Sequence, residues 1–285
     1  MYVNELQEDY NMPLKLMYIT NNLDVALIAE KYGVDRIWID LETLGKEERQ
    51  KNMNTVKSKH TIGDILKIKT HLSHAEMLVR INPWNDNSPK EIDAAINAGA
   101  DIIMLPMWKT DIEVINFILA VKSRVKTSLL LETREAVECL DKILDIDGFN
   151  EIHIGLNDLH LSYNLSFMFE LLSNGVVECI CEKLKKKGIV YGFGGIARLG
   201  EGDIPAEKII LEHYRLGSTR AILSRSFCNT ELISSLSEID NIFKVNMERL
   251  RKFEYSVAKN ANEVVFEKNI LDIRQSVDRV VEKKQ

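Results

Sequence analysis

Short apolar runs alternate with helical patterns along most of the chain, and this alternation constrains the fold more than any other feature. Eight runs of four to six residues are followed by helix-like segments, with no long linker between them. Repeated strand–helix units predict a parallel sheet with right-handed crossovers. A count of eight favours a closed barrel, so the predicted fold class is α/β, a (β/α)8 TIM barrel. The predicted strands are 14–19, 36–40, 77–81, 101–105, 128–131, 151–155, 189–193 and 219–223.

The length agrees with one barrel and leaves a surplus at the C-terminus. The chain has 285 residues, against about 250 for a typical barrel. We therefore predict a single domain over 1–285, with the barrel at about 14–230 and C-terminal helices at about 231–285. One helix suffices to close a barrel, so the apolar face of this segment is expected to pack on a neighbouring subunit of a homo-oligomer. The alternative is a long helix folded back on its own barrel.

Composition excludes several classes of partner. The net charge of −6 without a long basic run argues against nucleic-acid binding. The polar N-terminus does not resemble a signal peptide, and no apolar run approaches the roughly 20 residues of a membrane helix. The cysteines form no C-x-x-C pair and are expected to be reduced thiols in a cytoplasmic protein. They are Cys139, Cys179, Cys181 and Cys228.

Acidic residues follow three of the predicted strands. Asp40 and Glu42 come at the end of the second strand, Glu132 after the fifth and Asp158 after the sixth. A barrel enzyme places its working residues at these ends. Two such acids, Glu132 and Asp158, suit a hard divalent cation, Mg²⁺ first and Mn²⁺ as an alternative. The competing interpretation is that both acids only cap the helices that follow them.

Groups that bind anions follow other strands. Arg80 ends the third strand, and its planar fork fits a carboxylate in two hydrogen bonds. Gly194 and Gly195 follow the seventh strand, where backbone amides often bind an anion, and Arg225 follows the eighth. A cation held by two acids can chelate a pyruvate-like unit and stabilise its enolate. Alternatively, Arg80 is a structural ion-pair partner and the glycines only form a turn.

Five sequence motifs in a fixed order resemble one enzyme family. The similarity covers about 14–227 and points to the HpcH/HpaI aldolase and citrate lyase beta-subunit family of the phosphoenolpyruvate/pyruvate barrel superfamily. The motifs lie at 38–42, 79–82, 99–106, 131–133 and 154–159.

The resemblance implies an activity and a set of site residues. It implies a divalent metal and the cleavage or formation of a carbon–carbon bond next to a pyruvate, oxaloacetate or acyl-thioester enolate. Glu132 and Asp158 would be the metal ligands and Arg80 the carboxylate-binding arginine. Asp40 and Glu42 would hold metal-bound waters or orient the base. Members of the family often exchange the C-terminal helix between subunits, in agreement with the surplus noted above.

One position departs from the family pattern. The aldolases commonly have a histidine general base directly after the glutamate that corresponds to Glu42, and the citrate-lyase-like branch has an acid there; this chain has Thr43. A threonine cannot take a proton near neutral pH as imidazole can. We therefore consider His60, at the end of a long polar loop predicted over 45–59, as the candidate base. Thr61, which follows it, is predicted as the N-cap of the next helix. His160 and His213 are weaker candidates.

Together these features predict a metal-dependent carbon–carbon lyase of the aldehyde-lyase or oxo-acid-lyase type. Its substrate would be a hydroxy-keto acid or related carboxylate that passes through a pyruvate- or oxaloacetate-like enolate. One alternative is a phosphoenolpyruvate-using transferase or mutase, or an acyl-CoA lyase, on the same barrel. Another is a catalytically silent barrel that binds a keto acid or a partner protein, which Thr43 keeps open.

Overall fold

Eight parallel strands close into a barrel in the order β1 to β8. The computed structural model describes residues 13–45, 60–233 and 235–284, and it confirms the predicted fold class. The strands are β1 (Lys15–Ile19), β2 (Arg36–Asp40), β3 (Glu76–Arg80), β4 (Ile102–Leu105), β5 (Lys126–Leu131), β6 (Glu151–Ile154), β7 (Val190–Ile196) and β8 (Arg220–Leu223). Apart from Gly45, the long loop predicted over 45–59 lies outside the described residues.

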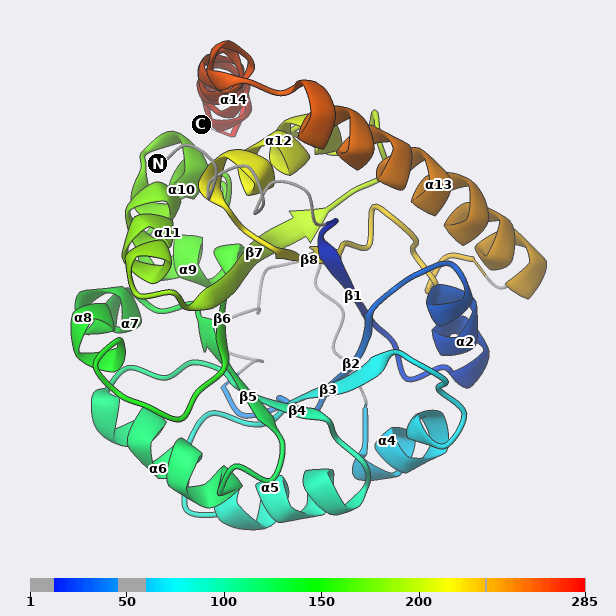
Figure 1. The fold of residues 1–285 in the computed structure, drawn as a ribbon, viewed down its shortest axis with the longest axis vertical. Helices are drawn as coiled ribbons and strands as arrows, with labels where there is room; N and C mark the ends of the chain where they lie inside the picture. Colours follow the sequence, from blue (N-terminus) through cyan, green and yellow to red (C-terminus); the bar gives the residue numbers. More distant parts are fainter. Residues whose placement is uncertain (1–12, 46–59, 234, 285) are drawn as a thin grey trace. The chain divides into compact units, whose positions relative to one another are not determined.

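Helices separate the strands, and two more follow β8 (Figure 1). They are α2 (Leu23–Lys31), α4 (Ile62–Lys69), α5 (Ser88–Asn97), α6 (Asp111–Val121), α7 (Arg134–Glu138), α8 (Leu140–Ile143), α9 (Leu156–Ser162), α10 (Glu170–Ser173), α11 (Val176–Lys186), α12 (Ala206–Leu216), α13 (Leu236–Asn260) and α14 (Glu263–Glu282).

The chain forms two compact units. The first unit is Met17–His153, and the second unit is the chain from Ile154 onward together with the described residues up to Leu16. The single domain expected from the length stays a prediction.

Helix starts in the first unit follow directly from the sequence. Thr61, predicted as an N-cap, precedes α4 and forms a capping box with Asp64. Thr110 does the same for α6 with Glu113. Each pair satisfies backbone N–H groups that the first turn of a helix leaves without a partner. These caps fix where each helix begins after the preceding strand.

The pairing of β2 with β3 sets the geometry of the first unit. Arg36 lies opposite Glu76 at the start of the two strands, and Asp40 lies opposite Arg80 at their end. All five residues of β2 are buried, as expected for a parallel strand that is covered on both faces. The register therefore brings oppositely charged side chains together at both ends of the same two strands.

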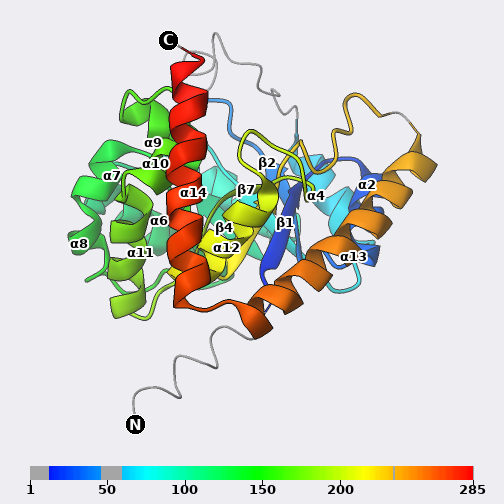
Figure 2. The same ribbon diagram turned by 90° about the horizontal axis from the view of Figure 1, so that it is seen from above.

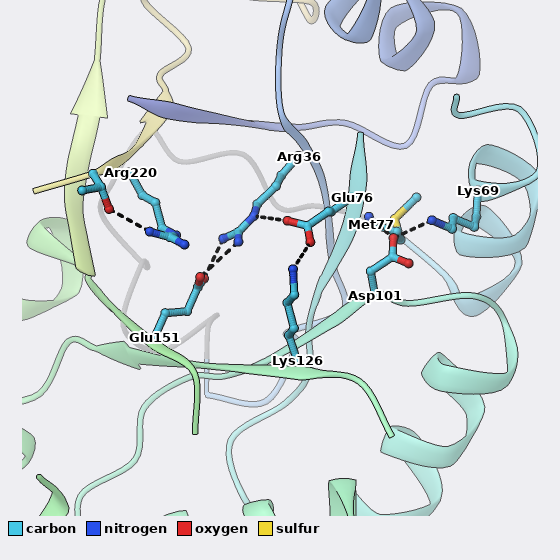
Figure 3. A network of polar contacts seen from close by, with 9 residues as sticks. Arg36, Lys69, Glu76, Met77, Asp101, Lys126, Glu151 and Arg220 are labelled. Atoms are coloured by element: carbon cyan, nitrogen blue, oxygen red, sulfur yellow. Dashed lines mark hydrogen bonds and ion pairs between the residues drawn. The ribbon is translucent and has the colours of Figure 1, made fainter. Parts of the chain in front are cut away.

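An ion-pair network lies at the N-terminal ends of the strands of the first unit (Figure 3). Arg36 donates to Glu76 at 3.0 Å and to both carboxylate oxygens of Glu151 at 2.6 and 3.0 Å. Lys126 pairs with the second oxygen of Glu76. Arg36 is 1% exposed and Glu151 4%. These groups are paired and hydrogen-bonded, which is what burial of charge requires.

In the second unit, α14 packs along α10 and α12 (Figure 2). Asn269 of α14 donates to the carbonyl of Lys208 at 3.0 Å and to Glu212 at 2.9 Å. The C-terminal helical segment starts later than predicted: α13 begins at Leu236, and Leu232 is 83% exposed. The spacing of apolar residues placed Leu232 within the predicted C-terminal helices. Spacing cannot show whether an apolar side chain packs against another surface in the folded protein. Exchange of this segment between subunits stays a prediction.

The glycines predicted to follow the seventh strand lie inside it. β7 runs to Ile196, with a register shift against β8 between Gly192 and Gly195. A Cβ on Gly192 would stand 2.3 Å from the carbonyl oxygen of Arg220. Gly194 has a φ of +47°, and a Cβ there would stand 2.8 Å from Leu156. Close packing inside the second unit thus requires these glycines, and this corrects the loop placement that the sequence suggested.

None of the helices in the described part of the chain combines the length and the apolar character that a membrane span needs.

Candidate active site

Arg80 is the centre of a cluster at the C-terminal ends of the strands of the first unit. Its Nε and Nη2 donate to the two carboxylate oxygens of Asp40, each at 2.8 Å. Its Nη1 lies 3.3 Å from a carboxylate oxygen of Glu42. A guanidinium has five N–H groups, so these two acids leave two of them for another partner. The fork is therefore oriented by Asp40 and still has donors to offer.

Three buried carboxylates of the described residues surround this guanidinium. Asp40 is 2% exposed, Glu42 1% and Glu132 2%, and the Arg80 side chain is 12% exposed. Burial lowers the pKa of Arg80, but Asp40, Glu42 and Glu132 raise it by more, so the net pKa is raised. Carboxylates are ligands that hard divalent cations prefer. This end of the strands therefore combines a group that can bind a carboxylate with acids that suit a cation.

Glu132 is held at the end of β5 but does not cap the helix that follows. Its Oε1 accepts the backbone N–H of Met107 at 3.1 Å. The N-cap of α7 is Thr133, whose hydroxyl accepts the N–H of Ala136 at 3.1 Å and donates to the carbonyl of Trp108 at 2.8 Å. The capping interpretation of Glu132 is therefore wrong, because the next residue has that role. Glu132 keeps its place in the cluster around Arg80.

Asp158 lies in the second unit, in the first turn of α9, and is 9% exposed. The sequence placed it just past the end of the sixth strand, and in the structure the helix that contains it begins at Leu156. An acid in a first turn also interacts favourably with the helix N-terminus. That it joins Glu132 around one ion stays a prediction.

His60 is tied to the end of β2 through its ring. Its Nδ1 accepts the backbone N–H of Asp40 at 3.0 Å. A neutral imidazole that accepts through Nδ1 carries its proton on Nε2. The role of His60 as general base stays a prediction.

His160 and His213, the two weaker candidates for the base, pack in the second unit. His213 is fully buried, stacks on Phe193 with ring centroids 3.9 Å apart, and shares a 2.7 Å hydrogen bond with Ser218. His160 is 5% exposed and bonds the carbonyl of Leu156 through Nδ1, and burial lowers its pKa.

Three predicted anion-binding residues belong to the second unit. Gly194 and Gly195 are strand residues of β7. Arg225 is exposed in the turn after β8. Anion binding by these residues stays a prediction.

A pocket of about 630 Å³ adjoins the end of β2. Its lining includes Leu41, Thr43, His60, Asn82 and Lys90. Sequence reasoning placed Asn82 at the end of the motif at 79–82 and assigned it no role. The one available signal was a polar side chain two residues beyond Arg80.

The acids of the cluster fit a hard cation that keeps part of its water shell. In the described residues, no group of three or more histidine, cysteine, aspartate or glutamate side chains is arranged to hold a metal ion. Mg²⁺ usually binds through one or two carboxylates and fills its remaining positions with water and substrate oxygens. The buried carboxylate of Glu132 matches that chemistry.

Comparisons with solved structures identify the same barrel. An HpcH/HpaI aldolase from Desulfitobacterium hafniense DCB-2 matches with a TM-score of 0.59 and 15% identity, over 79% of this chain and 90% of that chain. Citrate synthase SbnG matches with a TM-score of 0.59 and 16% identity, over 84% of this chain and 96% of that chain. Macrophomate synthase matches with a TM-score of 0.53 and 14% identity, over 78% of this chain and 82% of that chain. At these identities the likeness concerns the fold.

A comparison with curated protein sequences finds no match. The family model for HpcH/HpaI aldolase/citrate lyase matches residues 15–167, more than half of the chain. The matched range contains Asp40, Glu42, Arg80, Glu132 and Asp158. The chain therefore belongs to the HpcH/HpaI aldolase/citrate lyase family, a family of aldolases and lyases.

Proposed function

We propose that this protein is a metal-dependent carbon–carbon lyase that acts on a hydroxy-keto acid or related carboxylate. The observation that carries the proposal is the cluster around Arg80, where one oriented guanidinium faces three buried carboxylates. The remaining N–H groups of Arg80 suit the carboxylate of an α-keto acid. The buried carboxylate of Glu132 suits a divalent cation, most simply Mg²⁺.

The residues divide the work as follows. Arg80 binds and orients the substrate carboxylate, and Asp40 holds Arg80 in place. Glu132 and Asp158 hold the cation, which supplies Lewis acidity to an enolate when it is bound. A water held at Glu42, or the His60 ring, moves the proton, because Thr43 cannot.

Glu132 gives the sharpest test of this assignment. Glu132→Gln keeps the side-chain shape but removes the charge. We expect Mn²⁺ binding, measured by titration calorimetry, to weaken at least about tenfold, because a charged ligand is lost. Metal-dependent release of pyruvate from 4-hydroxy-2-oxo acids should fall with it.

Glu135→Gln is the matched control, since Glu135 follows three residues later on the surface and pairs with Lys109. It should bind Mn²⁺ as the unchanged protein does. Full metal binding and activity in Glu132→Gln would overturn the proposed function.

A second candidate function is a catalytically silent barrel that binds a keto acid. It is favoured by one observation: the hydroxyl of Thr43 donates to Asn82 at 3.3 Å, at the position where the aldolases of the family have their base. Calorimetry with Mg²⁺ and pyruvate, followed by turnover assays on the same samples, separates the two functions. Binding without turnover favours the silent barrel.

We also propose that the protein is a homo-oligomer through its C-terminal helix. Light scattering of the full chain and of the chain ending at residue 260 tests this, and a monomeric mass for both would overturn it.

A further inference from the structure

We propose that Asn82, oriented by Glu91, is a positioning residue that holds Glu42 against Arg80. The inference deepens the function proposed above and rests on it where activity is concerned.

The Asn82 side chain contacts the backbone on both sides of Glu42. Its Oδ1 accepts the backbone N–H groups of Thr43 at 2.9 Å and Leu44 at 3.0 Å. Its Nδ2 donates to the carbonyl of Leu41 at 3.4 Å. One amide thus ties down the residue before Glu42 and the two residues after it.

Glu42 is held from the barrel side as well. Its backbone N–H donates to Oδ1 of Asp40 at 3.2 Å, and its carboxylate meets Nη1 of Arg80. Arg80 and Asn82 are two residues apart at the end of β3. The end of β3 therefore carries both the partner of the Glu42 side chain and the amide that holds the backbone on either side of Glu42. We call the contacts of the Asn82 side chain with Leu41, Thr43 and Leu44 the clamp.

Glu91 of α5 decides which way the Asn82 amide points. Its Oε1 accepts from Nδ2 of Asn82 at 2.8 Å, and its Oε2 accepts the backbone N–H of Asn82 at 3.2 Å. An ionised carboxylate can only accept hydrogen bonds, so it draws the NH₂ of the amide toward itself. The amide oxygen must then face the N–H groups of Thr43 and Leu44, and the clamp depends on the polarity of both side chains.

Thr43 completes this clamp. Its hydroxyl donates to the same Oδ1 of Asn82 at 3.3 Å. The residue that stands at the position of the family's usual base is thus part of what holds the neighbouring glutamate in place.

The test changes which of the two side chains, Asn82 or Glu91, can donate a hydrogen bond, while the shapes of both side chains stay the same. Asn82→Asp places a carboxylate against Glu91, so two acceptors oppose each other and the clamp should open. Adding Glu91→Gln supplies a donor again, so the residue at 82 can accept from Thr43, Leu44 and the new amide. Two long contacts are lost, the one to the carbonyl of Leu41 and the 3.3 Å contact of the backbone N–H of residue 82 with Oε1 of Glu91. The double variant should therefore recover what the single variant loses.

Two readouts are measured on each full-length variant. The first is hydrogen exchange of the backbone amides of Thr43 and Leu44, which does not need activity. We expect exchange at least about tenfold faster in Asn82→Asp, because a hydrogen bond of ordinary strength is lost, and recovery in the double variant. The second is kcat and KM for pyruvate release. We expect kcat to fall about 10- to 100-fold through misplacement of Glu42 and to recover in the double variant.

Asn85→Asp is the matched control. Asn85 lies in the same turn and bonds the carbonyl of Pro83 and the N–H of Asn87, so exchange at Thr43 and Leu44 should not change.

The outcomes separate the two proposals. Unchanged exchange in Asn82→Asp overturns the clamp. Faster exchange that recovers, with kcat unchanged throughout, shows a clamp without a role in positioning and overturns the inference. If the unchanged protein turns over no hydroxy-keto acid, the proposed function fails, and the exchange cycle alone then decides whether Asn82 and Glu91 form the clamp.

Discussion

Two clusters of charge occupy opposite ends of the same two strands, and they are built differently. At the N-terminal ends of β2 and β3, Arg36 faces Glu76; at the C-terminal ends, Asp40 faces Arg80. The first cluster gains Glu151 and Lys126, which brings two cations and two acids together. Among the described residues, the second cluster gains further acids, so that one guanidinium and three carboxylates lie together.

The difference teaches which end is built from paired charges and which end gathers acids around one guanidinium. Arg36 and Glu151 are buried and joined by two hydrogen bonds, so we call the first cluster balanced. The acids of the second, unbalanced cluster suit a cation, and Arg80 suits a substrate carboxylate. This division agrees with the general organisation of barrels, in which the C-terminal face is catalytic and the N-terminal face contributes stability.

The largest expected effect is on stability, at the balanced end. Arg36→Met should lower the free energy of unfolding by about 3–5 kcal/mol, because Glu151 keeps a buried charge without its partner. Urea denaturation measures it. Arg36→Met combined with Glu151→Leu should recover most of the loss. An unchanged free energy of unfolding in the single variant would break the comparison.

The next effect is on activity, at the unbalanced end. Arg80→Lys keeps the charge but loses the two-point contact with Asp40. We expect kcat/KM for the keto-acid substrate to fall by about 10²–10³ (about 2.7–4 kcal/mol), as when one oriented donor is removed from an active site. Equal activity in Arg80→Lys would mean that the fork does not bind substrate.

A third effect is stabilisation by metal. A cation present at 100 times its dissociation constant should stabilise the folded protein by about 2.7 kcal/mol, observed as a rise in Tm with Mn²⁺. The rise should persist in Arg36→Met. In Glu132→Gln the stabilisation at the same Mn²⁺ concentration should shrink to about 1.4 kcal/mol or less, because binding is at least about tenfold weaker. If the rise in Tm were lost in Arg36→Met and kept in Glu132→Gln, the roles of the two clusters would be reversed.

The smallest effect is a dependence on pH. Burial raises the pKa of Glu76, but Lys126 and Arg36 lower it by more, so it lies below the ordinary value of about 4.5. Stability from this carboxylate is therefore present above the unfolded-state pKa and lost as the pH falls through the lowered folded-state pKa. Glu76→Gln should flatten this acid-side slope in urea denaturation. Glu138→Gln, in an exposed pair with Arg134, should leave it unchanged.

Much of the fold could be predicted because it depends on local sequence patterns. The bounds of β2 were predicted residue for residue, and Thr61 was predicted as the cap of α4. Strand ends also identified Asp40, Glu42, Arg80 and Glu132 as one group. Such features depend on residues a few positions apart, where periodicity and capping rules apply.

By itself, then, the sequence determined the barrel, its strand order and the set of charged residues at the strand ends. Only the tertiary structure decided the partners: that Arg36 pairs with Glu151 from 115 positions away, that the His60 ring accepts from Asp40, and that Asn82 braces Glu42. It also placed Gly194 inside β7. The physical reason is that a hydrogen bond or an ion pair depends on distance and direction in space. Strands separated by long stretches of chain acquire that geometry only when they pair in the folded protein.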